Sequence, residues 1–388
     1  MKQEEAYDII MAGHNVFLTG DAGTGKSWLT QKVIADYRKK GKTVIVTAPT
    51  GVAAINVGGA TLHSTFKVFG MYPFRRNVRQ QDVWWNQVDL VVIDEISMVG
   101  PDILDQIEYV MKSCARYGEP FGWIQVLLVG DAWQLKPVYA PHSAQDKQDY
   151  QGVLTKYNNR LTFDASDAFR TGWFKKCHLT EAKRQKDPAF LQAINLLRDG
   201  FSSVLSQFNT WIGDADTVHL MPTNDMVDEY NETKYRNLEW EEFRNTAYIE
   251  GDFNTKNAIT PVELKLKRDC RVMLTKNIKE YGLVNGDLGW VQYACNEYIE
   301  VKFDRFEYAI PIERATWKQI EYVGNEEFEI GSYRQFPLKL SWAITVHKSQ
   351  GLTLDNVCVH VTKWMKSDLL YVAVSRASNM EKLFINRR

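Results

Sequence analysis

Cysteine is scarce in this chain, and neither a long apolar run nor a strong net charge is present. The five cysteines among 388 residues are scattered without Cys-x-x-Cys spacing, which excludes a disulfide framework or zinc ribbon and indicates buried, reduced thiols. No apolar run approaches the roughly 20 residues that a membrane span needs, and the first residues lack a secretory signal. We therefore expect a cytoplasmic protein, in its own cell or a host, or one at the nucleoid.

The formal net charge is −1, which excludes a simple basic nucleic-acid binder. If nucleic acid is the partner, basic residues must gather on one face or in a groove. Clusters that could do this are Lys67 with Arg75, Arg76 and Arg79, then Lys265, Lys267, Arg268 and Arg271, then His347 with Lys348. Each cluster taken alone is also compatible with an ordinary solvated surface, so charge permits nucleic-acid binding without indicating it.

A glycine-rich loop follows an expected strand near the start of the chain. Residues 20–27 read Gly-Asp-Ala-Gly-Thr-Gly-Lys-Ser, between an apolar run at 15–19 and apolar residues at helical spacing over 28–37. In this setting Gly23, Thr24 and Gly25 close around a polyphosphate at a helix N-terminus. Lys26 would reach the β- and γ-phosphates, and Ser27 would offer its hydroxyl to Mg²⁺. The pattern predicts a nucleoside triphosphate site.

A second buried strand, expected at 88–93, ends in Asp94 and Glu95. The carboxyl end of a parallel strand is where the ligand crevice of such a sheet opens. Asp94 is then placed to hold Mg²⁺, and Glu95 to accept a proton from an attacking water. Because a pure binding protein has no need for such a base, the pair indicates an NTP hydrolase.

The order of expected elements indicates two α/β regions and one β region. Alternating strands and helices in the first half predict a parallel sheet with helices on both faces. The pattern resumes from Cys177, gives way near residue 270 to short strands typical of a small antiparallel barrel, and returns after 337. Residues 141–160 are polar and lack periodicity, which predicts a surface excursion. The expected domains are 1–64 with 87–176, an insertion at 65–86, 177–262 with 337–388, and the inserted barrel at 263–336.

Four further segments follow in an order that resembles a known family. They are Gly-Asp-Ala-Trp-Gln-Leu at 130–135, Leu-Thr-Glu-Ala-Lys-Arg-Gln at 179–185, the run at 342–354 that contains Thr-Val-His-Lys-Ser-Gln-Gly-Leu-Thr, and Tyr-Val-Ala-Val-Ser-Arg-Ala at 371–377. Together they resemble the PIF (petite integration frequency) family of superfamily-one DNA helicases, which is related to RecD-like and Dda-like enzymes. The resemblance covers nearly the whole chain and is weakest between 141 and 160.

The resemblance implies two RecA-like P-loop NTPase domains, with a small insertion in the first and a β-barrel in the second. ATP, with Mg²⁺, would be hydrolysed in the cleft between these domains. The implied activity is 5′→3′ translocation on single-stranded DNA and unwinding of duplex at single-strand/double-strand junctions, in replication, repair and recombination. We expect a monomer, and the protein partners stay open.

Several site residues follow from the resemblance alone. Gln3 matches the glutamine that reads the adenine edge, and Gln134 matches the residue that senses the γ-phosphate. Arg184 and Arg376 match two arginines that reach the nucleotide from the second domain, and Gly351 matches a backbone position near the γ-phosphate.

The DNA-facing residues are also implied by the resemblance. The matching positions are Thr50, Gly51, His63, Ser64, Thr345, His347 and Lys348. Base stacking needs aromatic faces, for which Trp133 is the first candidate, with Phe66 and Phe69 after it. Trp133 departs from the phenylalanine usual in the family. The insertion carries a candidate wedge for a duplex junction, composed of Met71, Tyr72, Phe74, Arg75, Arg76 and Arg79. A plain packed loop is the alternative for this segment.

Two other readings stay open at this stage. A translocase could strip proteins from DNA with little unwinding, and a nucleotide-switched binding module could use ATP only to change affinity. The presence of Glu95 and two candidate arginine fingers argues against the module. A nuclease is disfavoured because no acidic or His/Cys metal cluster is expected beyond Asp94 and Glu95.

Overall fold

The protein is described from a computed structural model. The residues described are 1–21, 23–68, 85–114, 119–131, 133–137, 139, 144–181, 187–210, 216–323, 326–350 and 352–387. They form two compact units, Met1–Lys183 with Gln319–Ile330, and Arg184–Lys318 with Gly331–Arg388.

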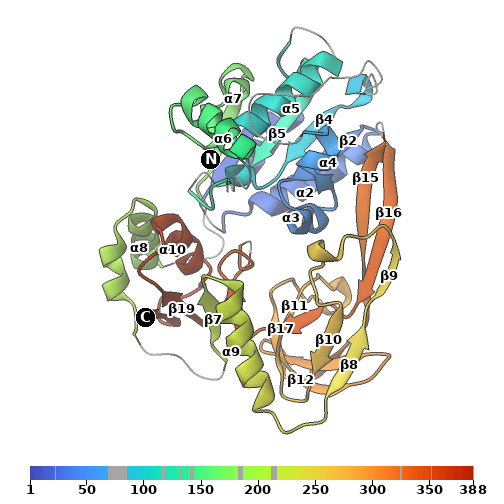
Figure 1. Cartoon of the computed structure of the whole chain (residues 1–388), viewed down its shortest axis with the longest axis vertical. Helices are drawn as coiled ribbons and strands as arrows, with labels where there is room; N and C mark the ends of the chain where they lie inside the picture. Colours follow the sequence, from blue (N-terminus) through green and yellow to red (C-terminus); the bar gives the residue numbers. More distant parts are fainter. Residues whose placement is uncertain are drawn as a thin grey trace. The chain divides into compact units, whose positions relative to one another are not determined.

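The first unit is built on a six-stranded parallel sheet with strand order β3-β2-β4-β5-β1-β6 (Figure 1). Its strands are β1 (Val16–Gly20), β2 (Val44–Ala48), β3 (Ala60–Thr61), β4 (Leu90–Ile93), β5 (Gln125–Val129) and β6 (Lys175–Leu179). Its helices are α1 (Gln3–Met11), α2 (Lys26–Lys39), α3 (Gly51–Val57), α4 (Leu62–Phe66), α5 (Pro101–Cys114), α6 (Ala144–Lys156) and α7 (Asp167–Thr171).

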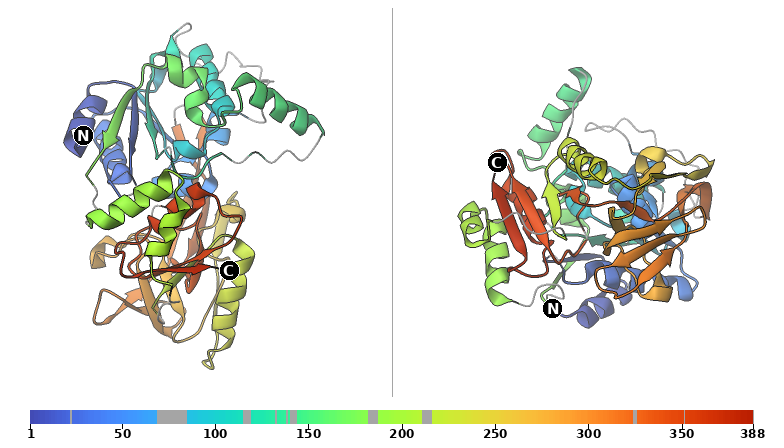
Figure 2. Two further views of the ribbon diagram at one scale, coloured as in Figure 1. Left: turned by 90° about the vertical axis from the view of Figure 1, so that its left-hand side faces the viewer. Right: turned by 90° about the horizontal axis from the view of Figure 1, so that it is seen from below.

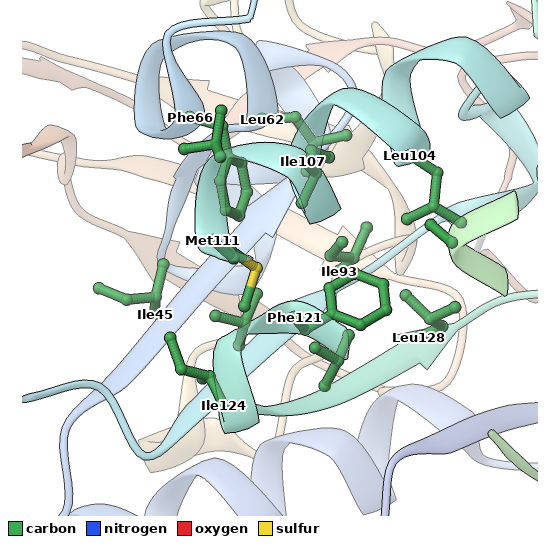
Figure 3. Close-up of a cluster of buried hydrophobic side chains, with 14 of the residues drawn as sticks. Ile45, Leu62, Phe66, Ile93, Leu104, Ile107, Met111, Phe121, Ile124 and Leu128 are labelled. Carbon is green, nitrogen blue, oxygen red and sulfur yellow. The ribbon is translucent and has the colours of Figure 1, made fainter. Parts of the chain in front are cut away.

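Both faces of this sheet are buried, because successive side chains of its strands enter two different cores. In β1, Phe17 enters one core, while its neighbours Val16 and Leu18 enter the other. The core on the Phe17 face is closed by α4 and α5, and Figure 3 shows Phe66 and Met111 pointing into it together. Helices α1 and α2 close the opposite face. The continuous apolar strands of the sequence reflect this two-sided cover.

The second unit contains a four-stranded parallel sheet with order β18-β7-β19-β20. Figure 2 shows β19 and β20, in red, side by side with β7 next to them. The strands are β7 (Val218–Met221), β18 (Ala343–Thr345), β19 (Val357–Val361) and β20 (Leu383–Arg387), and the helices are α8 (Pro188–Arg198), α9 (Asn224–Arg236) and α10 (Ser367–Val374). The expectation of an α/β fold with two parallel sheets is confirmed.

Antiparallel strands fill the chain between α9 and β18. A five-stranded sheet has the order β14-β13-β12-β11-β17, and smaller sheets join β10 to β8 and β15 to β16 and β9. Their bounds are β8 (Phe243–Thr246), β9 (Tyr248–Gly251), β10 (Glu263–Leu266), β11 (Arg271–Leu274), β12 (Leu288–Ala294), β13 (Ile299–Phe303), β14 (Ala309–Ile312), β15 (Ala315–Val323), β16 (Glu326–Gln335) and β17 (Leu338–Leu340). Closure of these strands into a barrel stays a prediction.

Three segments differ from the expectations. Cys177 belongs to β6, which pairs with β1, so the first sheet runs past the expected boundary at 176. The antiparallel strands begin at β8 and end with β17, outside the expected range 263–336. The polar stretch 141–160 contains α6, which buries Val153. Tyr157, directly after the helix, is also buried, and its hydroxyl donates a hydrogen bond to Asp105 at 2.7 Å. Two buried contacts thus support a helix with almost no apolar face.

Across the described part of the chain, every helix is too short or too polar to span a bilayer. Among the described cysteines, Cys177, Cys270 and Cys358 are buried, as expected, whereas Cys295 is half-buried.

Candidate functional sites

The glycine loop lies between β1 and α2, as the sequence predicts. Gly23 and Gly25 have φ angles of 81° and 84°, in the left-handed region that favours glycine. The Lys26 ammonium donates hydrogen bonds to the carbonyl oxygens of Gly20, at 2.7 Å, and Asp21, at 3.1 Å. The Thr24 hydroxyl donates to Asp21 at 2.9 Å. The cation is therefore held over the loop where a bound phosphate chain would pass.

Gln3 contacts this loop directly, although it lies far from it in sequence. Its side-chain amide donates hydrogen bonds to the carbonyl oxygens of Thr24, at 3.2 Å, and Gly25, at 3.3 Å. Helix α1, which begins at Gln3, packs against α2 through the core that contains Ala6 and Leu29. The first helix thus places a side-chain amide beside the phosphate loop.

The acidic pair lies directly after β4. The backbone amide of Asp94 donates to the carbonyl oxygen of Thr47 at 2.9 Å, which fixes the turn to β2. A carboxylate oxygen of Asp94 accepts a hydrogen bond from the backbone amide of Glu95 at 2.9 Å. Burial raises the pKa of Asp94, while the charge of Lys26 acts to lower this pKa. Glu95 has φ of 51°, an unfavourable conformation for a residue with a side chain. Such local strain is typical of functional turns.

A third turn follows β5. Gln134 is buried, and its side-chain amide donates to an Asp131 carboxylate oxygen at 3.3 Å. The Trp133 backbone amide donates to the other oxygen of Asp131 at 3.0 Å, while the Trp133 ring is 55% exposed. One aspartate therefore holds a polar side chain inward and an aromatic ring outward.

The strand order brings these three turns to one edge of the sheet. β5 lies between β1 and β4, and all three strands are parallel, so their carboxyl ends share that edge. Ser27, in the first turn of α2, and Asp94 supply a hydroxyl and a carboxylate, oxygen ligands of the kind that Mg²⁺ prefers. A buried carboxylate with a raised pKa is also a group whose charge a cation would stabilise.

The DNA candidates of the first unit follow the next two strands of the same sheet. Thr50 caps α3, and its hydroxyl accepts from the Ala53 amide at 3.2 Å. Thr61 caps α4 in the same way, and its hydroxyl lies 2.9 Å from that of Ser64. His63 lies in α4, and burial lowers its pKa. Short polar side chains at the ends of β2 and β3 thus extend the edge that carries the loop.

Phe66 is a correction to the sequence analysis. Its side chain is 0% exposed and belongs to the core between α4, α5 and the sheet. The ring stacks on Trp85, with centroids 5.1 Å apart and planes at 10°. It cannot present a face to a DNA base, because the core already covers the ring. Trp85 is a packing residue.

In the second unit, the candidates Thr345, His347 and Lys348 follow β18. The Thr345 hydroxyl accepts from the Lys348 amide at 3.2 Å, which shapes the turn. His347 and Lys348 are exposed, and partial burial lowers the pKa of the His347 ring, against the opposing charge of Asp368. The turn offers hydroxyl, imidazole and ammonium groups together.

Arg376, in the second unit, is held by hydrogen bonds to residues at the C-terminal end of α10 and in the segment after β18. Its guanidinium donates to the carbonyl oxygens of Val372, at 2.9 Å, and Ser349, at 3.5 Å, and to the Ser375 hydroxyl at 2.8 Å. The side chain is buried, so the fold fixes it in place. Arg184, Gly351, Phe69 and the candidate wedge all lie outside the described residues.

Two features of the second unit were missed in the sequence analysis. The first is Lys339 in β17, which lines a cavity of about 800 Å³ together with Lys265 and Lys348. Burial and the neighbouring charge of Lys348 lower the pKa of Lys339 to about 8. The lining also includes Asp228, Glu229, Glu232 and Glu263, so the cavity is of mixed charge. A lone lysine in a strand has no sequence signature, so only the fold reveals this cavity.

The second missed feature contradicts the expectation that no further His/Cys cluster exists. His219, Cys358 and His360 are all buried, and their potential ligand atoms lie within 4.8 Å of one another. The cluster lies on a buried sheet face, which does not suit a nuclease.

The parallel sheet, the glycine loop between β1 and α2, and the acidic turn after β4 define a protein of the P-loop NTPase class. A family model for PIF1-like helicases matches residues 1–206, and a second model, described as Helicase, matches residues 301–388. The chain belongs to the PIF1-like helicase family.

Individual relatives agree with this assignment. The ATP-dependent DNA helicase PIF1 of Xenopus laevis is 34% identical over 413 residues, which cover 98% of this chain and 60% of that protein. The crystal structure of Bacteroides sp. Pif1 in complex with ADP-AlF4 matches with a TM-score of 0.87 at 34% identity, and covers 99% of this chain and 91% of that one. Bacteroides Pif1 bound to single-stranded DNA matches with a TM-score of 0.64, at the same identity and coverage. The chain spans about 60% of the length of the Xenopus relative.

Proposed function

We propose that this protein is an ATP-dependent DNA helicase that moves 5′→3′ along single-stranded DNA and unwinds duplex. One observation supports this most strongly: the loop with Lys26, the acidic turn with Asp94 and Glu95, and the polar residues Thr50 and Ser64 follow strands of one parallel sheet. Nucleotide chemistry and DNA contact would then share one rigid edge. The complexes of the Bacteroides relative with ADP-AlF4 and with single-stranded DNA support the same assignment.

In the proposed reaction, Lys26 and the loop amides bind the phosphates, and Glu95 accepts the proton of the attacking water. Ser27 and Asp94 would hold Mg²⁺, which neutralises charge on the phosphate oxygens when bound. Gln134 contacts the γ-phosphate, and Gln3 contacts the adenine edge. Arg184 and Arg376 stabilise charge that develops on the transferred phosphoryl group, a contribution of about 10³–10⁵ in rate for arginine fingers.

On the DNA side, Thr50, Ser64 and Thr345 would contact phosphates, since such contacts position a strand without reading its sequence. Lys348 and Lys339 would add cations from the second unit. Trp133 would stack on a base. The protein would act as a monomer, and the wedge in the insertion stays part of the proposal.

The test compares ATP hydrolysis with and without a single-stranded oligonucleotide over a range of salt concentrations. We expect strong stimulation by DNA that fades as salt rises, because phosphate contacts release counterions. Forked substrates with only a 5′ or only a 3′ tail then test polarity, with displacement of the labelled strand as the readout. ATP hydrolysis and protein displacement without strand separation would favour a translocase, and DNA-independent hydrolysis would contradict the proposal.

A further inference from the structure

The sheet of the second unit brings together three side chains of types that can bind metal. His219 is far in sequence from Cys358 and His360, so no sequence motif indicates the cluster. His219 and Cys358 are direct partners in the register of β7 and β19. His360 lies two residues after Cys358 in β19, and alternate residues of a strand point to the same face. All three side chains therefore lie on one face, and all three are buried.

The donor atoms of the three residues converge. The His219 Nδ1 and His360 Nε2 atoms are 2.8 Å apart, and the Cys358 Sγ atom lies 4.0 Å from His360 Nε2. A zinc ion binds imidazole nitrogen at about 2.0–2.1 Å and thiolate sulfur at about 2.3 Å, so tetrahedral ligand atoms lie roughly 3.3–3.6 Å apart. Shifts of about half an ångström would bring the His219–His360 and Cys358–His360 spacings to these values. The His219–Cys358 spacing, which is within 4.8 Å, would shorten by at most about 1.2 Å.

A fourth residue orients the first histidine. The Tyr230 hydroxyl, on helix α9 over the same face, lies 2.9 Å from the His219 Nε2 atom. Metal-binding histidines commonly use the second ring nitrogen in a hydrogen bond of this kind, which fixes the ring and its tautomer. With Nε2–H donating to the Tyr230 oxygen, His219 presents the lone pair of Nδ1 to the cluster.

We propose that His219, Cys358 and His360 form a structural site for a thiophilic d¹⁰ cation, Zn²⁺ or Cu⁺, inside the second parallel sheet. Two imidazoles and a thiolate are ligands that suit both of these ions, whereas Mg²⁺ and Ca²⁺ prefer carboxylates. On binding, the metal replaces the Cys358 thiol proton, which is released to solvent. With the His219 proton on Nε2, the 2.8 Å contact in the metal-free cluster requires that the Nε2–H of His360 donates to His219 Nδ1. On metal binding the His360 proton moves from Nε2 to Nδ1 by exchange with solvent, so that the Nε2 lone pair can bind the metal. No electron transfer is involved.

The two ions differ in what they require of the site. Cu⁺ accepts three ligands and forms a neutral unit with one thiolate, which suits a buried position because burial of net charge is unfavourable. Zn²⁺ requires a fourth ligand, such as water, and leaves a net positive charge. Either ion would join β7 to β19 and stabilise the second unit, and neither would take part in ATP hydrolysis.

The experiment measures metal binding by the intact protein. Metal-stripped protein is titrated with Zn²⁺, with Co²⁺ as a spectroscopic substitute, and with Cu⁺ under reducing conditions against a chromophoric chelator. We expect one equivalent of Zn²⁺ or Cu⁺ to bind, a thiolate-to-cobalt charge-transfer band, and a rise in melting temperature with the preferred ion. These measurements on the unaltered chain need no variant to fold.

Variants then locate the site. Cys358→Ser should lower the affinity at least 100-fold and remove the charge-transfer band, whereas Cys270→Ser, at another buried free cysteine of the same unit, should change neither. Tyr230→Phe should lower the affinity about 10- to 100-fold, the usual effect of removing a partner of a metal-binding histidine, with the stoichiometry unchanged. The proposal is overturned if the unaltered protein binds no equivalent of either ion, or if Cys358→Ser binds as tightly. The cluster is then a hydrogen-bonded histidine pair only.

Discussion

The side-chain amide of Gln3 lies 3.3 Å from the carbonyl oxygen of Gly25, at the start of the helix that follows the phosphate loop. A Cβ atom at position 25 would lie only 2.2 Å from that amide nitrogen. The φ of 84° favours glycine here, and a side chain at this position would also push the Gln3 amide away from the loop.

Gly25→Ala is expected to reduce ATP affinity at least about tenfold. A side chain in the left-handed conformation costs about 1–2 kcal/mol, and the new methyl group also displaces Gln3. Gly13→Ala is the matched control, since Gly13 has φ of +87° but no atom within 4 Å of the place that a methyl group would take. Titration with a fluorescent ATP analogue measures both. Unchanged affinity in Gly25→Ala would show that the loop does not bind the nucleotide in this conformation.

Lys26→Ala and Glu95→Gln are expected to separate binding from hydrolysis. The first removes the phosphate cation, so both nucleotide binding and turnover should be lost. The second keeps the shape of the turn but removes the base, so ATP should still bind while kcat falls about 10²–10⁴-fold. Equilibrium binding and single-turnover hydrolysis distinguish the two variants. Undiminished turnover in both would mean that the active site has been misplaced.

Asp94→Asn is expected to increase stability while it removes magnesium-dependent hydrolysis. Burial raises the folded-state pKa of Asp94 above its unfolded value, so the ionised carboxylate disfavours the folded state at neutral pH. The free energy of unfolding, measured without nucleotide, should therefore rise at pH 7. Below the unfolded pKa, near pH ~3.9, both states bind the proton and the gain should disappear. A gain that persists at low pH would assign it to another cause.

Trp133→Ala is expected to weaken DNA binding, whereas Phe66→Ala is expected to lower stability. Removal of the exposed Trp133 ring should weaken single-stranded DNA binding by about 1–3 kcal/mol, the usual contribution of one stacked base, with little change in melting temperature. Removal of the buried Phe66 ring should destabilise the first unit by about 3–5 kcal/mol without a specific loss of DNA affinity. Fluorescence anisotropy and thermal unfolding test the pair. A loss of DNA affinity in Phe66→Ala but not in Trp133→Ala would contradict the assignment of Phe66 to the core and of Trp133 to the DNA contact.

DNA affinity is expected to fall between pH 7 and pH 9 because of Lys339. Its pKa is lowered to about 8, so the ammonium is largely charged at pH 7 and largely neutral at pH 9. Lys339→Arg, which stays charged, should lose this pH dependence, and Lys339→Ala should bind weakly at both values and lower the salt slope by about 1. Identical pH profiles for the three proteins would exclude Lys339 from the DNA contacts.

Local patterns were enough to predict the phosphate loop and the acidic turn. Each of them depends on a strand, a short loop and a helix that are consecutive in sequence, so composition and spacing determine them without distant contacts. Helix α8 is of the same local kind, because a proline at its first position and an apolar periodicity mark it within its own segment. Helix α6 was missed because Val153 alone of its described residues belongs to a buried apolar cluster. Its other contacts, such as the ion pair of Lys156 with Asp105, produce no periodic apolar pattern.

The sequence by itself determined the class of this protein, since Lys26, Ser27, Asp94 and Glu95 stand in motifs whose chemistry depends on neighbours along the chain. Only the tertiary structure decided that Phe66 is buried under Trp85 and that His219 lies beside Cys358 across two strands. Burial and register depend on which strands pair. That pairing results from the free energy of many contacts between residues distant in sequence, which no single segment encodes.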